Sequence, residues 1–165
     1  RNIDPKHADA VYRDTGLKLK KARKWGKAAE CFRQLARAES FDNELRYELS
    51  VCNVKQSAKE LATHLRAEDQ ALRGFQALLG ERKFKLPDRL KKDRTLDASD
   101  LFYIGFHFSE GTGDEAKLGK QLLEFVAKRW SGKKEGRAAR NKLKLGAQPA
   151  AVVPTPVATP GAQPR

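Results

Sequence analysis

The sequence is poor in the residues that build disulfides and metal sites. It contains two cysteines, Cys31 and Cys52, and neither belongs to a C-x-x-C or histidine-rich pair that would hold a metal. The histidines His7, His64 and His107 lie far apart, and none has a His or Cys partner one helical turn away. We therefore expect no metal site. We also expect both cysteines to be reduced core residues in a cytoplasmic protein.

Long hydrophobic runs and phosphate-binding loops are missing as well. No stretch approaches the roughly 18 apolar residues that span a bilayer, so membrane insertion is not expected. The segments GERKFKL and SEGTGDE lack the Gly-Lys-Ser/Thr ending that cradles phosphates. Methionine is absent and Arg1 comes first, from which we expect a segment of a longer or processed chain.

Catalytic residues do not gather anywhere along the chain. The nearest approach to an acid–base cluster is His107 beside Glu110 and Asp114, which we interpret as a structural histidine near a helix end. The sequence therefore predicts neither an enzyme nor a cofactor.

Helical periodicity is what the sequence has in abundance. In the first 40 residues, apolar side chains recur every three or four positions, which predicts one helix after Pro5 and a second from Trp25. The inward stripe of the first helix is Ala8, Val11, Tyr12, Thr15, Leu19 and Ala22. Because the connection between the two helices is very short, they must fold back as an antiparallel hairpin. Gly16 and Ala28 remove side-chain bulk where the two backbones come close.

The run DPKHADAVYRDTGLKLKKARKWGKAAECFRQLA resembles a tetratricopeptide repeat. In that family an aromatic residue, a Gly, a large apolar residue, an Ala and a second aromatic residue recur over roughly 34 residues. The residues in these places are Tyr12, Gly16, Leu19, Ala28 and Phe32. The resemblance implies a right-handed stack of antiparallel hairpins, a solenoid, that holds a peptide or protein segment on its concave surface. The partner contacts expected on the outward side of the first helix are Arg13, Leu17, Lys20, Lys21 and Lys24.

Less regular helices are predicted in the middle of the chain. The apolar positions within 45–52, 58–65 and 71–79 indicate three short to medium helices. The segment LPDRLKK adds a single short helix with Pro87 in its first turn.

A second, degenerate repeat is predicted at 98–130. Asp97 and Asp100 form a helix-start signal before LFYIGFHF, although the aromatic and β-branched residues there leave a β-strand as the alternative. A glycine-rich turn and a returning helix through Trp130 complete the hairpin. Its packing residues are expected to be Gly105, Phe108 and Phe125.

These observations predict an all-α protein with one folded domain and a tail. The helical repeat domain spans 1–145, with its clearest repeat at 8–40 and a basic capping helix at 134–145. Five of the seven prolines and no acidic residue lie in 146–165, which predicts a disordered Pro/Ala-rich linker or tail.

Positive charge dominates the composition. Thirty-four Lys and Arg against 21 Asp and Glu give a formal net charge of +13. Clustered cations repel one another, which favours an acidic partner for the predicted scaffold. The alternative interpretation is that the basic surface is only solvated and binds nothing. The competing function is binding of nucleic acid or another polyanion. The residues expected to bind it are Lys133, Lys134, Arg137, Arg140 and Lys144.

Overall fold

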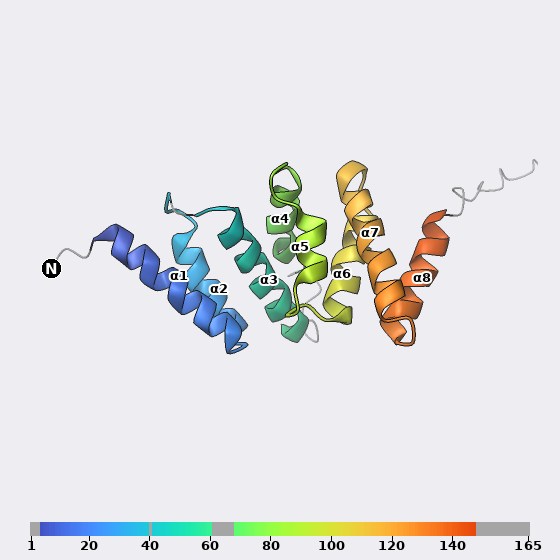
Figure 1. The fold of residues 1–165 in the computed structure, drawn as a ribbon, viewed down its shortest axis with the longest axis horizontal. Coiled ribbons are helices and arrows are strands. Elements are labelled where there is room, and N and C mark those ends of the chain that lie inside the picture. The colour runs from blue at the N-terminus through green and yellow to red at the C-terminus, as the bar shows by residue number, and fades with distance from the viewer. Residues whose placement is uncertain (1–3, 40, 61–67, 148–165) are drawn as a thin grey trace, which may run out of the picture.

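The structure is a computed structural model that describes residues 4–39, 41–60 and 68–147. Regular secondary structure within these ranges is entirely helical, which confirms the all-α prediction. The helices follow one another in chain order along the long axis of the molecule (Figure 1). Their bounds are α1 (Pro5–Lys21), α2 (Trp25–Leu35), α3 (Asn43–Glu60), α4 (Glu68–Leu79), α5 (Leu86–Lys92), α6 (Ala98–Ser109), α7 (Gly113–Arg129) and α8 (Lys134–Ala147). From position 148 onward, the predicted tail lies outside the described residues.

The helix-start signal at Asp97 is confirmed. The Asp97 carboxylate accepts a hydrogen bond from the Asp100 amide at 2.9 Å, and the Asp100 carboxylate accepts one from the Asp97 amide at 3.0 Å. This capping box satisfies two amides that the first turn of a helix leaves without partners. The segment LFYIGFHF is helical within α6, so the β-strand alternative is wrong.

The middle of the chain differs from the prediction of separate helices at 45–52 and 58–65. Residues Asn43–Glu60 form one continuous helix, α3. The sequence NELRYELSVCNVKQSAKE contains no Gly or Pro that would end it, so the polar residues between the two apolar groups do not interrupt the backbone. The predicted apolar residues Leu61, Ala62 and Leu65 lie outside the described residues.

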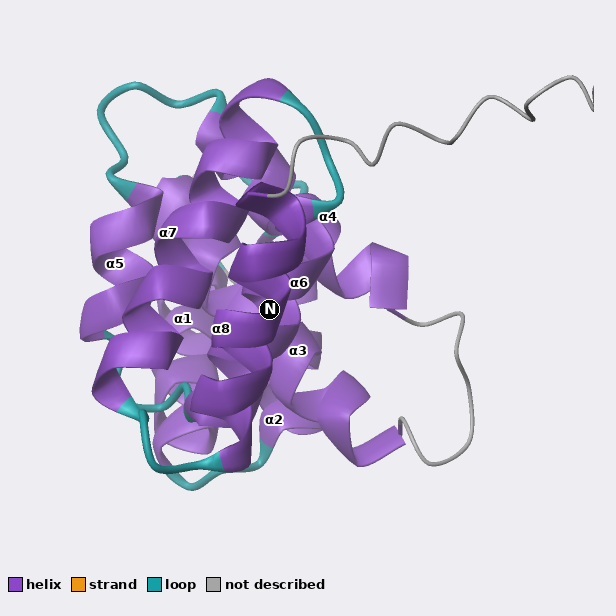
Figure 2. Cartoon of the chain, turned by 90° about the vertical axis from the view of Figure 1, so that its right-hand side faces the viewer, coloured by secondary structure: helices purple, strands orange, loops and turns teal. Residues whose placement is uncertain are grey.

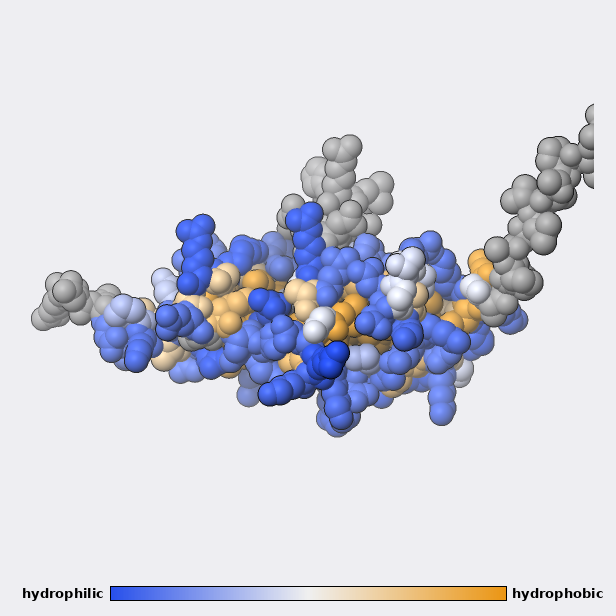
Figure 3. All heavy atoms as spheres, turned by 90° about the horizontal axis from the view of Figure 1, so that it is seen from above, coloured by the Kyte–Doolittle hydropathy of each residue, from blue (hydrophilic) through white to orange (hydrophobic). Residues whose placement is uncertain are grey.

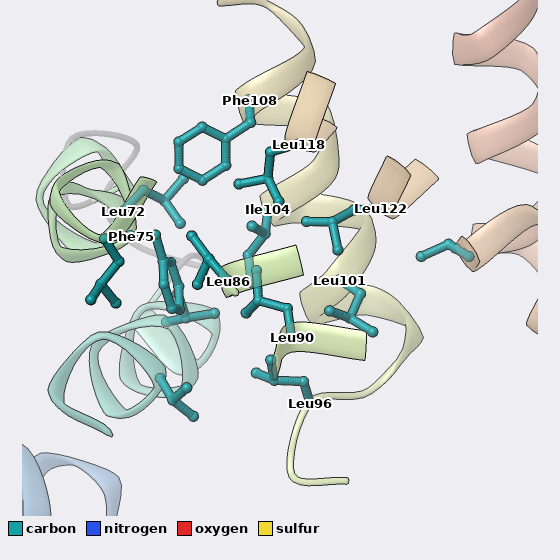
Figure 4. Close-up of a cluster of buried hydrophobic side chains, with 14 of the residues drawn as sticks. Leu72, Phe75, Leu86, Leu90, Leu96, Leu101, Ile104, Phe108, Leu118 and Leu122 are labelled. Carbon is teal, nitrogen blue, oxygen red and sulfur yellow. The ribbon is translucent and has the colours of Figure 1, made fainter. Parts of the chain in front are cut away.

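Helix α3 connects two hydrophobic clusters. On one side Leu45 and Cys52 pack with Trp25, Phe32 and other residues of α2. On the other side α3 contributes to the larger cluster, shown in Figure 4, through Tyr47, Val51 and Val54. That cluster contains Leu72 and Phe75 of α4, Leu86 and Leu90 of α5, Ile104 and Phe108 of α6, and Leu118 and Leu122 of α7. Because α3 is apolar on two sides, the clusters share one helix.

Most consecutive helices pack against one another. Helix α1 packs on α2, α2 on α3, and α3 on α4; further along, α6 packs on α7 and α7 on α8. The short α5 contacts α4 and α7. The view in Figure 2 shows the same helices joined by loops. Among the described helices, none combines the length and the apolar character that crossing a membrane requires.

Helix α1 turns a different face to its neighbour than its apolar stripe suggests. Gly16 is its one buried residue, and a Cβ atom there would lie 2.6 Å from the Phe32 ring of α2. Val11 and Tyr12 of the predicted inward stripe are 50% and 41% exposed. The close approach at Gly16 therefore decides which face of α1 meets α2, and part of the apolar stripe remains exposed.

Helices α6 and α7 also meet at a glycine. A Cβ atom at Gly119 would lie 2.2 Å from the backbone nitrogen and 2.6 Å from the Cα of Ser109. Backbone atoms cannot move aside as the end of a flexible side chain can. Gly119 therefore sets how closely α7 packs against the end of α6.

We predict that Gly119→Ala lowers the free energy of unfolding by about 2 kcal/mol or more, because the new methyl group overlaps the Ser109 backbone. Urea unfolding followed by circular dichroism measures the change. The matched control is Gly146→Ala in α8, where nothing lies within 4 Å of the added Cβ. Helix propensity makes this control neutral or stabilising by up to about 1 kcal/mol. Equal effects of the two variants would contradict the close packing.

The turn between α1 and α2 holds an arginine in left-handed backbone geometry. Arg23 has a φ of 58°, and the amides of Arg23 and Lys24 donate to the carbonyls of Lys20 and Leu19, both at 2.9 Å. This pattern is a Schellman motif, which usually places Gly at the left-handed position.

We predict that Arg23→Gly raises the free energy of unfolding by about 0.5 kcal/mol or more, because glycine adopts this φ without strain. Urea unfolding tests the change. The control is Arg33→Gly inside α2, which should cost about 1 kcal/mol of helix propensity. A destabilising Arg23→Gly would mean that the side chain supports the turn.

Candidate functional site

A buried polar cluster joins α3 to α5. The Tyr47 side chain is fully buried, and its hydroxyl donates to the Asp93 carboxylate at 2.7 Å. The Arg89 guanidinium lies 4.9 Å from the centroid of the Tyr47 ring and pairs with Glu44 at 2.7 Å. Burial alone would raise the pKa of Asp93, but hydrogen bonds from Thr95 and Tyr47 lower it. Burial and the Asp93 charge raise the pKa of Tyr47. A neutral phenol that donates to an ionised carboxylate stabilises the fold and offers no nucleophile.

A buried ion pair joins α3 to the start of α6. Lys55 pairs with Asp100 and lies 3.7 Å from the Asp97 carboxylate. Its ammonium group also lies 5.7 Å from the centroid of the Trp25 ring. Burial raises the pKa of Asp100. Burial would also raise the pKa of Asp97, but a hydrogen bond from the Asp100 amide and the Lys55 charge lower it. Lys55 thereby brings the start of α2, the end of α3 and the start of α6 together.

Two of the predicted partner contacts on α1 already have partners within the chain. Arg13 pairs with Asp42 at 2.8 Å, and Lys20, which is largely buried, pairs with Glu48. Leu17 is 42% exposed, and Lys21 and Lys24 are exposed. Neither of these two lysines makes an ion pair among the described residues. The residues open to a partner are therefore Leu17 and Lys21 on α1, Lys24 in the turn after it, and the exposed Val11 and Tyr12 on other sides of α1.

The predicted packing residues fall into three groups. Fully buried positions are Ala28, Phe32 and Phe108, and Gly16 and Gly105 are buried at helix crossings. Leu19 is half-buried against the α2 cluster, and Phe125 is half-buried against Trp130. Tyr12 lies largely outside the core.

Of the residues predicted to bind a polyanion at α8, one is engaged within the fold and four are exposed. Arg140 donates to the carbonyls of Ala127 and Ser131 at 3.4 and 3.1 Å, so it caps the end of α7. The exposed cations without an ion pair among the described residues are Lys133, Lys134, Arg137 and Lys144.

A cavity of about 820 Å³ is a feature that the sequence analysis did not predict. It lies between the end of α5, the α5–α6 turn, the start of α6 and the end of α7. Its lining includes four cations, Lys91, Lys92, Arg94 and Arg129, and the indole of Trp130. The sequence signal was present, since both KKDR and KRW place cations where a helix ends. That these two ends meet could only be seen in three dimensions.

Groups that could hold a metal do not assemble in the part of the chain that the structure describes. No cluster of three or more His, Cys, Asp or Glu side chains is found there. His7 is exposed and His107 is half-buried, while His64 lies outside the described residues. Glu110, which neighbours His107 in sequence, pairs with Lys142 of α8. Cys52 is buried and Cys31 half-buried, both as free thiols.

Hydrophilic side chains cover most of the face shown in Figure 3, and hydrophobic ones are visible between them. Comparison of the chain with protein-family models, with curated proteins and with solved structures finds no match. The candidate surfaces therefore rest on the geometry of this chain alone.

We predict that Asp93→Asn lowers the free energy of unfolding at pH 7 by about 2 kcal/mol, because Tyr47 loses a charged acceptor. The lowered pKa of Asp93 means that its contribution is complete above the unfolded pKa of about 4 and is lost as the pH falls through the folded pKa. Wild type and variant should therefore converge in acid. Urea unfolding at neutral and acid pH measures both values. The control is Asp14→Asn on the exposed side of α1, which should change little.

Proposed function

We propose that the chain is a non-catalytic scaffold that binds a peptide or protein segment. In this proposal the helices form a right-handed, tetratricopeptide-like stack of antiparallel hairpins over 1–145, and 146–165 is a disordered linker. The consecutive packing of α1 on α2, α3 on α4 and α6 on α7 supports the hairpin arrangement. The two free thiols agree with a reducing, cytoplasmic setting.

The observation that carries the proposal is the exposure of three large apolar side chains on α1. Val11, Tyr12 and Leu17 are 41–50% exposed on a single helix, and the cations Lys21 and Lys24 lie at its end. An α-helix at the end of a stack has a neighbour on one side only, so apolar side chains on its other sides stay exposed. The partner that fits combines apolar side chains with acidic ones.

Affinity capture from lysate of the source cells, with and without nuclease treatment, tests this proposal. We predict that wild type retains a protein that Leu17→Asp loses, because a carboxylate replaces an apolar contact. The matched control is Leu145→Asp on α8, which places the same change at a residue that is 65% exposed. Circular dichroism checks that both variants fold. Loss of the captured protein on nuclease treatment, or equal loss with both variants, would contradict the scaffold.

Polyanion binding by α8 is the second candidate. It is favoured by exposed cations that make no ion pair among the described residues, Lys133 just before that helix and Lys134, Arg137 and Lys144 within it. Binding of this kind falls steeply as salt rises, whereas an apolar contact responds far less.

A further inference from the structure

The cavity between α5, α6 and α7 carries unbalanced positive charge. Its lining holds four cations, Lys91, Lys92, Arg94 and Arg129, against two carboxylates, Asp93 and Asp97, which are held in the fold by hydrogen bonds. Lys91, Lys92 and Arg94 make no ion pair among the described residues. The cations outnumber the carboxylates, and three of them have no ion pair among the described residues, so the cavity is positively charged.

An aromatic surface lies beside these cations. Trp130 lines the cavity, and its ring meets Phe125 edge-on at a centroid separation of 5.9 Å. The Arg129 guanidinium lies 5.3 Å from the Trp130 centroid and 5.8 Å from that of Phe125. A planar cation and an indole in one cavity offer stacking surfaces to a flat, aromatic ligand group.

The positive charge continues beyond the cavity along one edge of the molecule. Figure 1 shows the turns after α1, α5 and α7 along the lower edge of the row. Lys55 connects the first two turns, because it contacts both Trp25 at the start of α2 and the capping box of α6. The exposed cations in these turns and just after them are Arg23, Lys24, Arg94, Lys133 and Lys134.

Helix dipoles explain only part of this distribution. Lys91, Lys92 and Arg129 lie in the last turns of α5 and α7, where a cation offsets the negative end of the dipole. Arg94 and Arg23 lie beyond the helix ends. Arg23 also keeps a φ of 58°, a geometry in which glycine is favoured. A cation at a position where the backbone favours glycine adds charge to this edge at a cost in backbone strain.

We propose that the cavity binds a segment of single-stranded nucleic acid, with phosphates against Lys91, Lys92 and Arg94 and a base against Trp130. The volume of about 820 Å³ is in the range of pockets that hold small organic ligands, so a nucleotide fits where an isolated phosphate would leave most of it empty. The basic edge on either side accommodates the strand as it leaves the cavity. A duplex keeps its bases stacked inside and cannot place one on the indole. This proposal goes beyond the scaffold and does not depend on it.

Fluorescence anisotropy of labelled oligothymidylate of about 12 nucleotides tests the site with the full chain. We expect the triple variant Lys91→Gln, Lys92→Gln, Arg94→Gln to bind about tenfold more weakly at physiological salt, with a salt slope smaller by about two. The matched control is Arg82→Gln, Lys83→Gln, Lys85→Gln in the α4–α5 turn, which removes the same charge at the other end of α5. It should weaken binding by less than about threefold.

Tryptophan fluorescence tests the stacking contact separately. The chain has two tryptophans, and Trp25 is buried in the other cluster. Oligothymidylate should quench the emission of the Trp25→Phe variant, where Trp130 remains, and leave that of Trp130→Phe unchanged. Heparin, a polyanion without bases, should displace the strand but cause no quenching. Arg23→Gly should weaken binding although it stabilises the fold.

Three results would overturn the proposal. The first is equal weakening by the two triple variants, which would indicate unspecific attraction to a basic protein. The second is binding of a duplex of the same length as tightly as the single strand. The third is the absence of quenching from Trp130. None of these results bears on the capture experiment with Leu17→Asp, so the scaffold stands or fails on its own.

Discussion

The rest of the structure depends on α3 being apolar on two sides. One side completes the cluster around Trp25 and Phe32, and the other completes the cluster around Tyr47, Phe75 and Phe108. A helix that is polar on one face can close only one core. Because α3 closes two, the hairpin α1–α2 and the helices from α4 onward are held in one row. The polar contacts of α3 add specificity, since Tyr47 and Lys55 reach α5 and α6 through charged partners.

The up-and-down course of the helices has an electrostatic consequence. Turns that are far apart in the sequence come to lie along the same edge (Figure 1). Last turns rich in Lys and Arg suit the helix dipole, so a local preference for cations at the ends of α1, α5 and α7 becomes a basic edge. The cavity at Trp130 interrupts this edge where the α5–α6 turn meets the end of α7. The fold thus concentrates charge that is spread widely in the sequence.

Local signals in the sequence were sufficient for most helices. Pro5, Asp97 and the spacing of Ala28 and Phe32 act within a few residues, and the helices begin and pack where these signals indicate. The prediction of separate helices at 45–52 and 58–65 failed, because α3 runs without interruption through the polar residues between them. Lys55 lies in that stretch and pairs with Asp97 and Asp100, which lie some 40 positions downstream. A pattern read along one helix cannot reveal such a partner.

In the candidate sites, too, contacts between residues that are distant in the sequence overrode the local pattern. The apolar stripe of α1 looked inward by periodicity, but α1 packs closely on α2 at Gly16, and Val11 and Tyr12 of the stripe are left exposed while Leu19 packs against the α2 cluster. Arg13 and Lys20 looked free on α1, but Asp42 and Glu48 engage them. The cavity forms because the end of α5, with Lys91, lies beside the end of α7, with Trp130. Each of these outcomes depends on which helices are neighbours, and that information is absent from local spacing.

The sharing of α3 between two clusters can be tested through the two tryptophans. Trp25 reports on the cluster around α2, and Trp130 packs against the larger one. In urea, the fluorescence transition of each single-tryptophan variant should coincide with its own circular dichroism transition, because loss of α3 removes both clusters together. Separate transitions, with the environment of Trp25 lost before the bulk of the helix content, would contradict the account.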